Sequence, residues 1–116
     1  MLKLKNKYGY IAISDSVIAR IVGGVATSCF GVVGMAARTA ADSFASLLKW
    51  ENMERGIEIN CTESKTIDIT LHIIMTYGVN IPAISDSIRN SVIHSVEELT
   101  GAKVSKVSII VETLKM

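Results

Sequence analysis

The residues best suited to chemistry in this chain are two histidines, His72 and His94, and two cysteines, Cys29 and Cys61. Imidazole and thiolate groups bind zinc when three or four of them recur at short, fixed spacing. These residues are scattered, without a CxxC or Cys/His motif and without a third ligand beside either histidine. The spacing therefore predicts no metal site. The cysteines fit small buried side chains in a reducing compartment.

No pattern in the chain predicts catalysis. Serine is frequent, but there is no GxSxG nucleophile elbow, no Walker A motif and no dinucleotide-binding GxGxxG. Glu97 and Glu98 are adjacent on a predicted helix, so their carboxylates point apart and do not form an acid–base pair. Glu98 lies four residues after His94 and can pair with it on that helix. We therefore expect a protein that is not an enzyme and that uses no cofactor.

The segment GVVG, from Gly31 to Gly34, resembles the GxxG loop with which KH domains clamp a nucleic-acid backbone. A KH loop joins two helices and is helped by basic residues, whereas the nearest positive charges here are Arg20 and Arg38. Twelve Lys and Arg residues against eleven Asp and Glu give a net charge of +1, which provides no general attraction to nucleic acid. A turn that requires small residues also explains the pattern. The alternative function is thus a KH-like RNA-binding module, while we expect no nucleic-acid partner.

Apolar periodicity is weaker in the first half of the chain than in the second half. Tyr8–Ile13 predicts a short strand, and the apolar spacing that follows predicts a helix over Asp15–Ser28. Phe30–Ala37 is punctuated by glycine and fits either a short strand or an extended turn. Asp42–Lys49 predicts a short amphipathic helix, and Trp50–Gly56 reads as a loop. The region from 30 to 56 is a variable insert whose structure the sequence does not define.

The second half of the chain has clear periodicity. Apolar and polar residues alternate over 57–61 and again over 67–77, and a short polar link joins the two runs, which predicts an antiparallel hairpin. The only proline, Pro82, then stands where a helix begins, because its missing N–H and fixed φ suit the first helical turn. An apolar stripe follows to Leu99, and Gly101 ends the helix. Val104–Leu114 is the last predicted strand.

Together these elements predict an α+β fold, a two-layer sandwich in β-α-β-β-α-β order with a variable insert. The helices cover one face of a mostly antiparallel sheet, and residues 1–116 form a single domain, since no linker divides them. The predicted core combines the helical stripe with the inward positions of the strands: Ile69, Leu71, Ile73, Ile84, Ile88, Val92, Val96, Val107 and Ile109.

The opposite sheet face offers a candidate interface. Ile74 and Ile110 fall among polar residues on that face, with His72 beside them. Apolar side chains on an exposed sheet face often mark a contact with a partner, although scattered surface residues of this kind are also normal. A symmetric homo-oligomer is the simplest way to cover such a face.

The residue pattern as a whole resembles the alkaline shock protein family of Gram-positive bacteria. The resemblance is carried by YGYIAISDSVIARIVGGVA, GVVGM, ENMERGIEI, IDITLHIIMTYGVNIPAISDSIRNSVIHSVEELTG and VSKVSIIV. The most specific part is the strand, the YG turn, the IP that opens the helix and the EELTG that closes it. The segment from Arg38 to Met53 is the most individual part of the chain.

The resemblance implies a cytoplasmic protein of envelope homeostasis or envelope stress, acting as a scaffold or regulator. Some members of the family associate with themselves, and some are held near the membrane by a partner protein. One branch, which this sequence resembles most, is found beside a dihydroxyacetone-kinase-like fatty-acid kinase, which implies a link to lipid metabolism. The family carries no established catalytic residues. No apolar run here is long enough for a signal peptide or a membrane-spanning helix, so we expect no direct membrane insertion.

Overall fold

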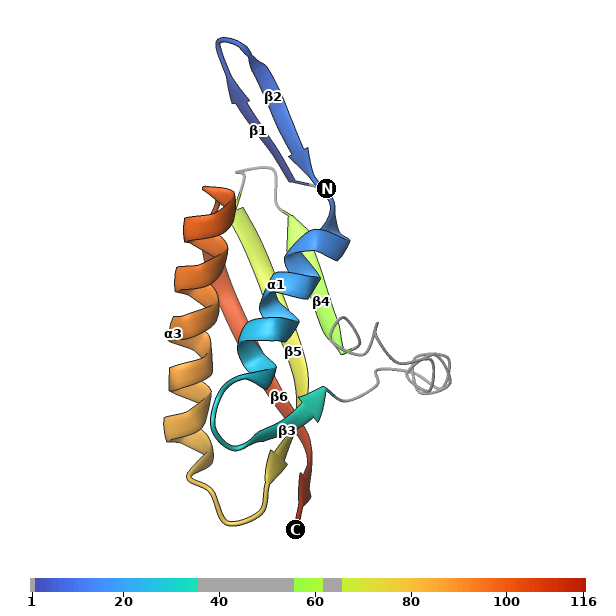
Figure 1. Ribbon diagram of the computed structural model, residues 1–116, viewed down its shortest axis with the longest axis vertical. Helices are drawn as coiled ribbons and strands as arrows, with labels where there is room; N and C mark the ends of the chain where they lie inside the picture. The colour runs from blue at the N-terminus through green and yellow to red at the C-terminus, as the bar shows by residue number, and fades with distance from the viewer. Residues whose placement is uncertain (1, 36–55, 62–65) are drawn as a thin grey trace.

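A computed structural model of the chain describes residues 2–35, 56–61 and 66–116 (Figure 1). Its main sheet is built around β5 (Thr66–Thr76), the central strand. On one edge β5 pairs antiparallel with β4 (Ile57–Cys61) and with β3 (Val32–Met35), which meet different stretches of it. On the other edge it pairs with β6 (Lys103–Lys115) over its full length. The predicted hairpin of two alternating runs is therefore confirmed.

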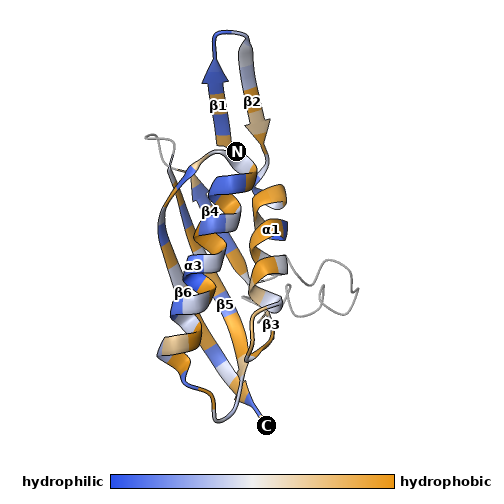
Figure 2. Ribbon diagram, turned by 60° about the vertical axis from the view of Figure 1, so that its left-hand side comes forward, coloured by the Kyte–Doolittle hydropathy of each residue, from blue (hydrophilic) through white to orange (hydrophobic). Residues whose placement is uncertain are grey.

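Two helices cover one face of this sheet, α1 (Asp15–Thr27) and α3 (Ile81–Thr100) (Figures 1 and 2). Ser14 caps α1 by accepting a hydrogen bond from the Val17 amide. Asn80 caps α3 in the same way, with Pro82 in the first turn as the sequence predicts. The two-layer α+β sandwich is thus confirmed, with both helices on the same side.

The strand β6 runs parallel to β5, whereas β3 and β4 run antiparallel to it. The reason is α3, which carries the chain from the end of β5 back along the sheet before β6 begins. The pairing shifts register twice, between Ile67 and Asp68 and between Ile73 and Ile74. The second shift leaves Glu112 without a direct partner on β5.

The core lies between the helices and the sheet. Most of the predicted core residues are fully buried, and Ile84 and Ile109 are half-buried and pack against them. Leu99 was expected on the same stripe but is 69% exposed, because the buried positions of α3 end one turn earlier, at Val96. The buried apolar core comprises Leu2, Ile18, Ala19, Val22, Ala26, Ile57, Ile67, Ile69, Leu71, Ile73, Met75, Ile88, Val92, Val96, Ala102 and Val107.

A second, two-stranded sheet stands at one end of the long axis of the molecule (Figure 1). It is the antiparallel hairpin of β1 (Leu2–Asn6) and β2 (Gly9–Ile13). The strand β2 matches the predicted Tyr8–Ile13 segment, but the sequence analysis did not identify its partner β1. Leu2 at the base of the hairpin is 2% exposed and joins the main core, so the hairpin is held at its foot while its tip projects.

The region from 30 to 56 is only partly described. Val32–Met35 is a strand, which settles the choice between strand and turn for the start of Phe30–Ala37. The predicted helix at Asp42–Lys49 and nearly all of the predicted loop Trp50–Gly56 lie outside the described residues. Within the described ranges, no helix is long and apolar enough to cross a membrane.

Candidate functional site: the open face of the sheet

The side of the sheet opposite α1 and α3 carries the candidate interface residues. We call this surface the open face, because neither helix lies over it (Figure 2). Along β5 the buried side chains alternate with half-buried ones, and the half-buried set points away from the helices. The register of the neighbouring strands brings their outward side chains beside this set. The open face comprises Glu58, Thr70, His72, Ile74, Ser108, Ile110 and Glu112.

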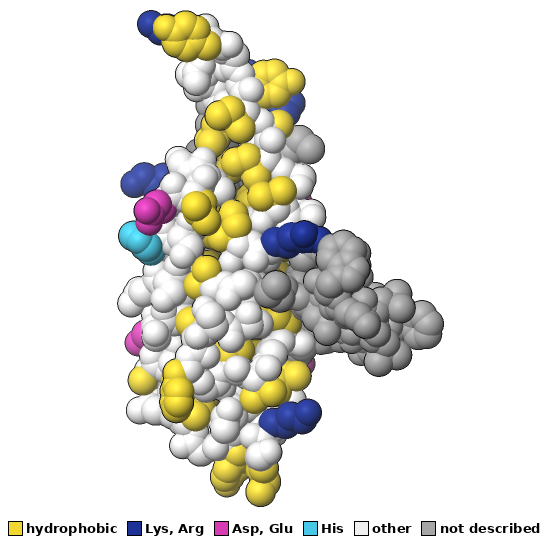
Figure 3. All heavy atoms as spheres, in the orientation of Figure 1, with side chains coloured by type: hydrophobic (Ala, Val, Ile, Leu, Met, Phe, Trp, Pro, Cys, Tyr) yellow, Lys and Arg dark blue, Asp and Glu magenta, His cyan; other side chains and the backbone are white. Residues whose placement is uncertain are grey.

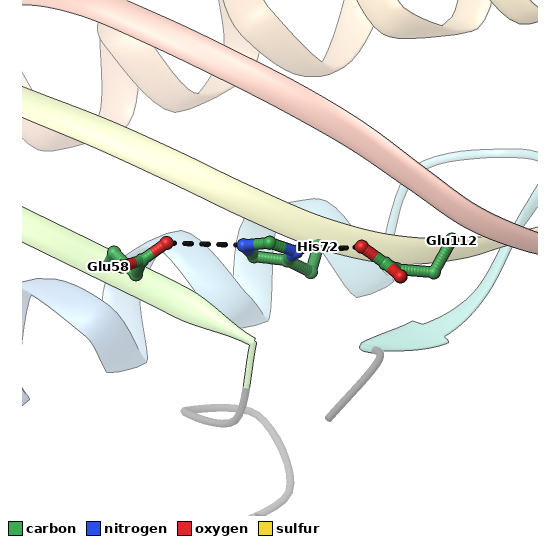
Figure 4. A network of polar contacts seen from close by, with 3 residues as sticks. All are labelled: Glu58, His72 and Glu112. Carbon is green, nitrogen blue, oxygen red and sulfur yellow. Dashed lines mark hydrogen bonds and ion pairs between the residues drawn. The ribbon is translucent and has the colours of Figure 1, made fainter. Parts of the chain in front are cut away.

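His72 lies at the centre of the open face, between two carboxylates (Figure 4). Its Nδ1 is 2.9 Å from Oε1 of Glu112 on β6, and its Nε2 is 3.2 Å from Oε2 of Glu58 on β4. The imidazole therefore bridges all three strands. Only 16% of its side chain is exposed, against 47% for Glu58 and 43% for Glu112. Both nitrogens have carboxylate acceptors, so the doubly protonated imidazolium satisfies the site best.

The surroundings of His72 act on its pKa in opposite directions. Partial burial of the ring lowers the pKa of His72, while hydrogen bonds to Glu112 and Glu58 and the negative charges of both raise it. The carboxylates prevail, and the pKa of His72 lies above its ordinary value. Protonation of His72 places one positive charge between two negative ones on the open face.

Apolar side chains flank this polar trio. Ile110, the β6 residue in register with His72, is 41% exposed, and Ile74 follows on β5 and is half-buried. Val33 on β3 is 49% exposed and lies at the register shift of that strand, between Val32 and Gly34. The structure therefore places the three predicted interface residues, Ile74, Ile110 and His72, on one face.

The other chemistry-bearing residues do not join this site. His94 pairs with Glu98 at 2.8 Å on the outer surface of α3, where both side chains are well exposed, as their spacing predicts. Cys29 and Cys61 are free and half-buried, and burial raises the pKa of both thiols. Within residues 2–35, 56–61 and 66–116, no cluster of His, Cys, Asp or Glu has the geometry of a metal site.

The GVVG segment leads from α1 into β3, rather than joining two helices as a KH loop does. Gly31 has φ of +88° and turns the chain, and its carbonyl accepts a hydrogen bond from the Thr76 amide at 2.8 Å. Gly34 lies within β3, opposite Ile74. A β-carbon at Gly31 would lie 2.5 Å from Cδ1 of Ile84. The turn that needs a small residue therefore has a structural cause at Gly31.

Sequence reasoning did not identify Glu58 and Glu112 as partners of His72. Glu58 lies on the outward side of β4, and the alternation of that strand is a signal that could have placed it beside His72. Alternation along the last strand predicts Glu112 on the same face as His72, and the structure adds that Glu112 is the extra β6 residue at the register shift opposite Ile73 and Ile74, with its carboxylate at the imidazole. No sequence pattern predicts that register shift.

Comparison with known proteins shows which family the chain is similar to. Residues 3–116 match the model of the alkaline shock protein 23 family, described as having a cell envelope-related function. An uncharacterized protein of Streptococcus pyogenes is 39% identical over 99% of this chain and 95% of its own length. The uncharacterized protein YloU of Bacillus subtilis is 34% identical over 99% and 96%.

A more distant relative carries a functional name. A stress response regulator gls24 homologue of Streptococcus pyogenes is 27% identical over 92% of this chain, which spans 59% of the homologue. No solved structure gives a significant match.

Proposed function

This chain belongs to the alkaline shock protein 23 family, and from that premise we propose that it acts in envelope homeostasis or stress response as a non-enzymatic scaffold or regulator. Its action depends on protein–protein contact through the open face. The two free thiols, Cys29 and Cys61, fit the reducing cytoplasm. The relative named a stress response regulator supports the stress role.

The observation that carries this proposal is the composition of the open face. Ile110 is 41% exposed there, and half-buried Ile74 lies with it near the bridged imidazole of His72. Exposed aliphatic side chains on a sheet face favour coverage by another surface. The contacts of His72 with Glu58 and Glu112 link the three strands that carry this surface.

The face is a better contact surface than the free edge of β6. That edge has no strand partner within the described residues, and edges can pair with other chains. However, β6 carries three exposed lysines, Lys103, Lys106 and Lys115, and its register shifts twice. Lysines and irregular register are the devices by which proteins discourage edge-to-edge pairing. Contact through the open face avoids these obstacles.

The occupant that we propose for the open face is a second copy of the chain. A symmetric pair uses the same patch twice, so Ile74 and Ile110 of one copy meet their equivalents across a two-fold axis. Protonated His72 offsets part of the negative charge that the two pairs of carboxylates would bring together. Self-association is therefore expected to strengthen when His72 is protonated.

The test is the solution mass of the wild type beside the variant Ile74→Glu/Ile110→Glu, measured by sedimentation or light scattering at tens of micromolar, where ordinary micromolar dimers form. We expect a dimeric wild type and a monomeric variant. Val17→Glu/Leu99→Glu is the matched control, because it adds the same charge at exposed apolar positions of α1 and α3. A strictly monomeric wild type, or a variant with unchanged mass, would refute contact through this face.

The envelope role is tested in cells. In Bacillus subtilis lacking its relative YloU, this chain should restore growth under alkaline or envelope stress, and the Ile74→Glu/Ile110→Glu variant should not, while the Val17→Glu/Leu99→Glu control should. A pull-down with the same proteins tests the proposed partner, an envelope-associated or lipid-metabolism protein. Equal rescue by both variants would show that the envelope role does not depend on the open face.

A further inference from the structure

The projecting β1–β2 hairpin combines positive charge, exposed aromatic rings and an aliphatic side. Residues 2–13 contain three lysines, Lys3, Lys5 and Lys7, and no acidic residue. Tyr8 and Tyr10 are 86% and 63% exposed. The net charge of +1 for the whole chain conceals this local concentration of positive charge.

The pairing of the hairpin separates its side chains onto two faces. Leu4 lies opposite Ile11, and Lys5 lies opposite Tyr10, and directly opposed residues point to the same side. One face is therefore aliphatic and the other basic and aromatic. Ile11 is 58% exposed on the aliphatic side, away from the core contact that buries Leu2 at the foot.

Each tyrosine ring at the tip is accompanied by an ammonium group. The Nζ of Lys7 lies 5.1 Å from the ring centroid of Tyr8, and the Nζ of Lys3 lies 5.4 Å from that of Tyr10. Figure 3 shows basic and hydrophobic side chains gathered together along the hairpin and at its tip. The hairpin lies at one end of the long axis, so the body of the protein does not obstruct its approach to a flat surface (Figure 1).

We propose that the tip of this hairpin adsorbs to the surface of a bilayer containing anionic phospholipids. The lysines meet the phosphate groups, and the tyrosines sit at headgroup level. Tyrosine is enriched at this depth because its ring is apolar and its hydroxyl is polar, and lysine extends its ammonium toward the phosphates. The contact is peripheral and needs no membrane-spanning segment.

The side chains favour a lipid surface over single-stranded nucleic acid. Nucleic acid binds through bases stacked on open aromatic faces, and here a lysine already lies over each tyrosine ring. The open face runs along the side of the molecule, so adsorption by the tip leaves it accessible and does not rest on the function proposed above.

The experiment is co-sedimentation with vesicles of equal parts phosphatidylglycerol and phosphatidylcholine, and with vesicles of phosphatidylcholine alone. We expect binding to the first only, weakened by salt. Each lysine near an anionic surface contributes about fivefold to partitioning, so Lys3→Ser/Lys5→Ser/Lys7→Ser should lower it on the order of 100-fold. The control Lys103→Ser/Lys106→Ser/Lys115→Ser removes the same charge from β6 and should bind as the wild type does.

Two further variants separate the proposal from general charge attraction and from loss of folding. Lys3→Arg/Lys5→Arg/Lys7→Arg keeps the charge and should bind like the wild type. Tyr8→Ser/Tyr10→Ser keeps the charge too but should bind more weakly. Equal loss in the β6 control, unchanged binding without the tyrosines, or tighter binding to a single-stranded RNA oligonucleotide than to the vesicles would overturn the proposal.

Discussion

His72 and Glu112 are forty residues apart in the chain, yet the imidazole Nδ1 and a carboxylate oxygen lie 2.9 Å apart across the β5–β6 pair. The same ring reaches Glu58 on the opposite neighbouring strand at 3.2 Å. A single side chain thus connects the antiparallel and the parallel halves of the sheet. Because both contacts are with carboxylates, the strength of this connection depends on whether His72 is protonated.

The first prediction concerns pH and stability. The pKa of His72 is raised in the folded protein by Glu112 and Glu58, against the opposing effect of burial. A raised pKa means that the folded state binds the proton more tightly than the unfolded state does. The stabilisation is therefore fully present below the unfolded pKa of about 6.5 and is lost as pH rises through the higher folded pKa.

Urea unfolding at a series of pH values and fixed protein concentration measures this effect. The difference in unfolding free energy between the wild type and His72→Gln should be greatest below pH ~6.5 and should shrink as pH rises. The variant Glu58→Gln/Glu112→Gln keeps the histidine but removes both charges, and it should abolish the same pH-dependent part. A difference that grows with pH would contradict the assignment.

The second prediction concerns the core. Ile88 on α3 is fully buried, so Ile88→Ala removes buried methyl groups and leaves a cavity, at a cost of about 2–5 kcal/mol in unfolding free energy. Leu99→Ala is the control on the same helix, because Leu99 is 69% exposed and its truncation should change stability by less than about 0.5 kcal/mol. Similar losses for both substitutions, measured by urea unfolding, would show that the packing of α3 is misassigned.

The sequence predicted the elements that bury one side against the core. The helical stripe through Ile88, Val92 and Val96 and the alternation along β5 follow directly from the periods of 3.6 and 2, since a one-residue slip would expose apolar side chains. The position of Pro82 at the start of α3 follows from its backbone chemistry. The outward placement of Ile74, Ile110 and His72 follows from the same alternation.

Other features depend on contacts distant in the sequence. LKLKN alternates apolar and basic residues, but β1 is defined by its pairing with β2 and by the burial of Leu2 in the main core, which no local pattern reveals. Alternation predicts the face on which Glu112 lies, but it does not predict the register shift at which Glu112 is found, because a shift has no compositional signal. Leu99 is a case in which the local pattern predicts too much. It lies on the apolar side of α3, but the buried part of that side ends before it, at Val96.

The third prediction tests the cap of α3. The Asn80 side-chain oxygen accepts a hydrogen bond from the Ala83 amide at 3.2 Å, which satisfies one of the free N–H groups at the helix start. Asn80→Ala should therefore lower the unfolding free energy by about 0.5–2 kcal/mol. Asn90→Ala, at an exposed position inside the same helix, should be neutral or slightly stabilising, because alanine is the better helix former. Equal effects in thermal unfolding would contradict the capping role.

The last prediction distinguishes the two glycines of GVVG. Gly31 has φ of +88°, and a β-carbon there would meet Cδ1 of Ile84, so Gly31→Ala combines backbone strain with a clash against α3. We expect a loss of about 1–3 kcal/mol, most of it from the left-handed backbone, since the end of the isoleucine side chain can move. Nothing lies within 4 Å of a β-carbon at Gly34, which sits in β3, so Gly34→Ala should stay within about 0.5 kcal/mol of the wild type. If GVVG also clamped nucleic acid, Gly34→Ala would weaken RNA binding although it leaves stability nearly unchanged. Urea unfolding and an RNA-binding titration of both variants therefore decide between a structural turn and a nucleic-acid clamp.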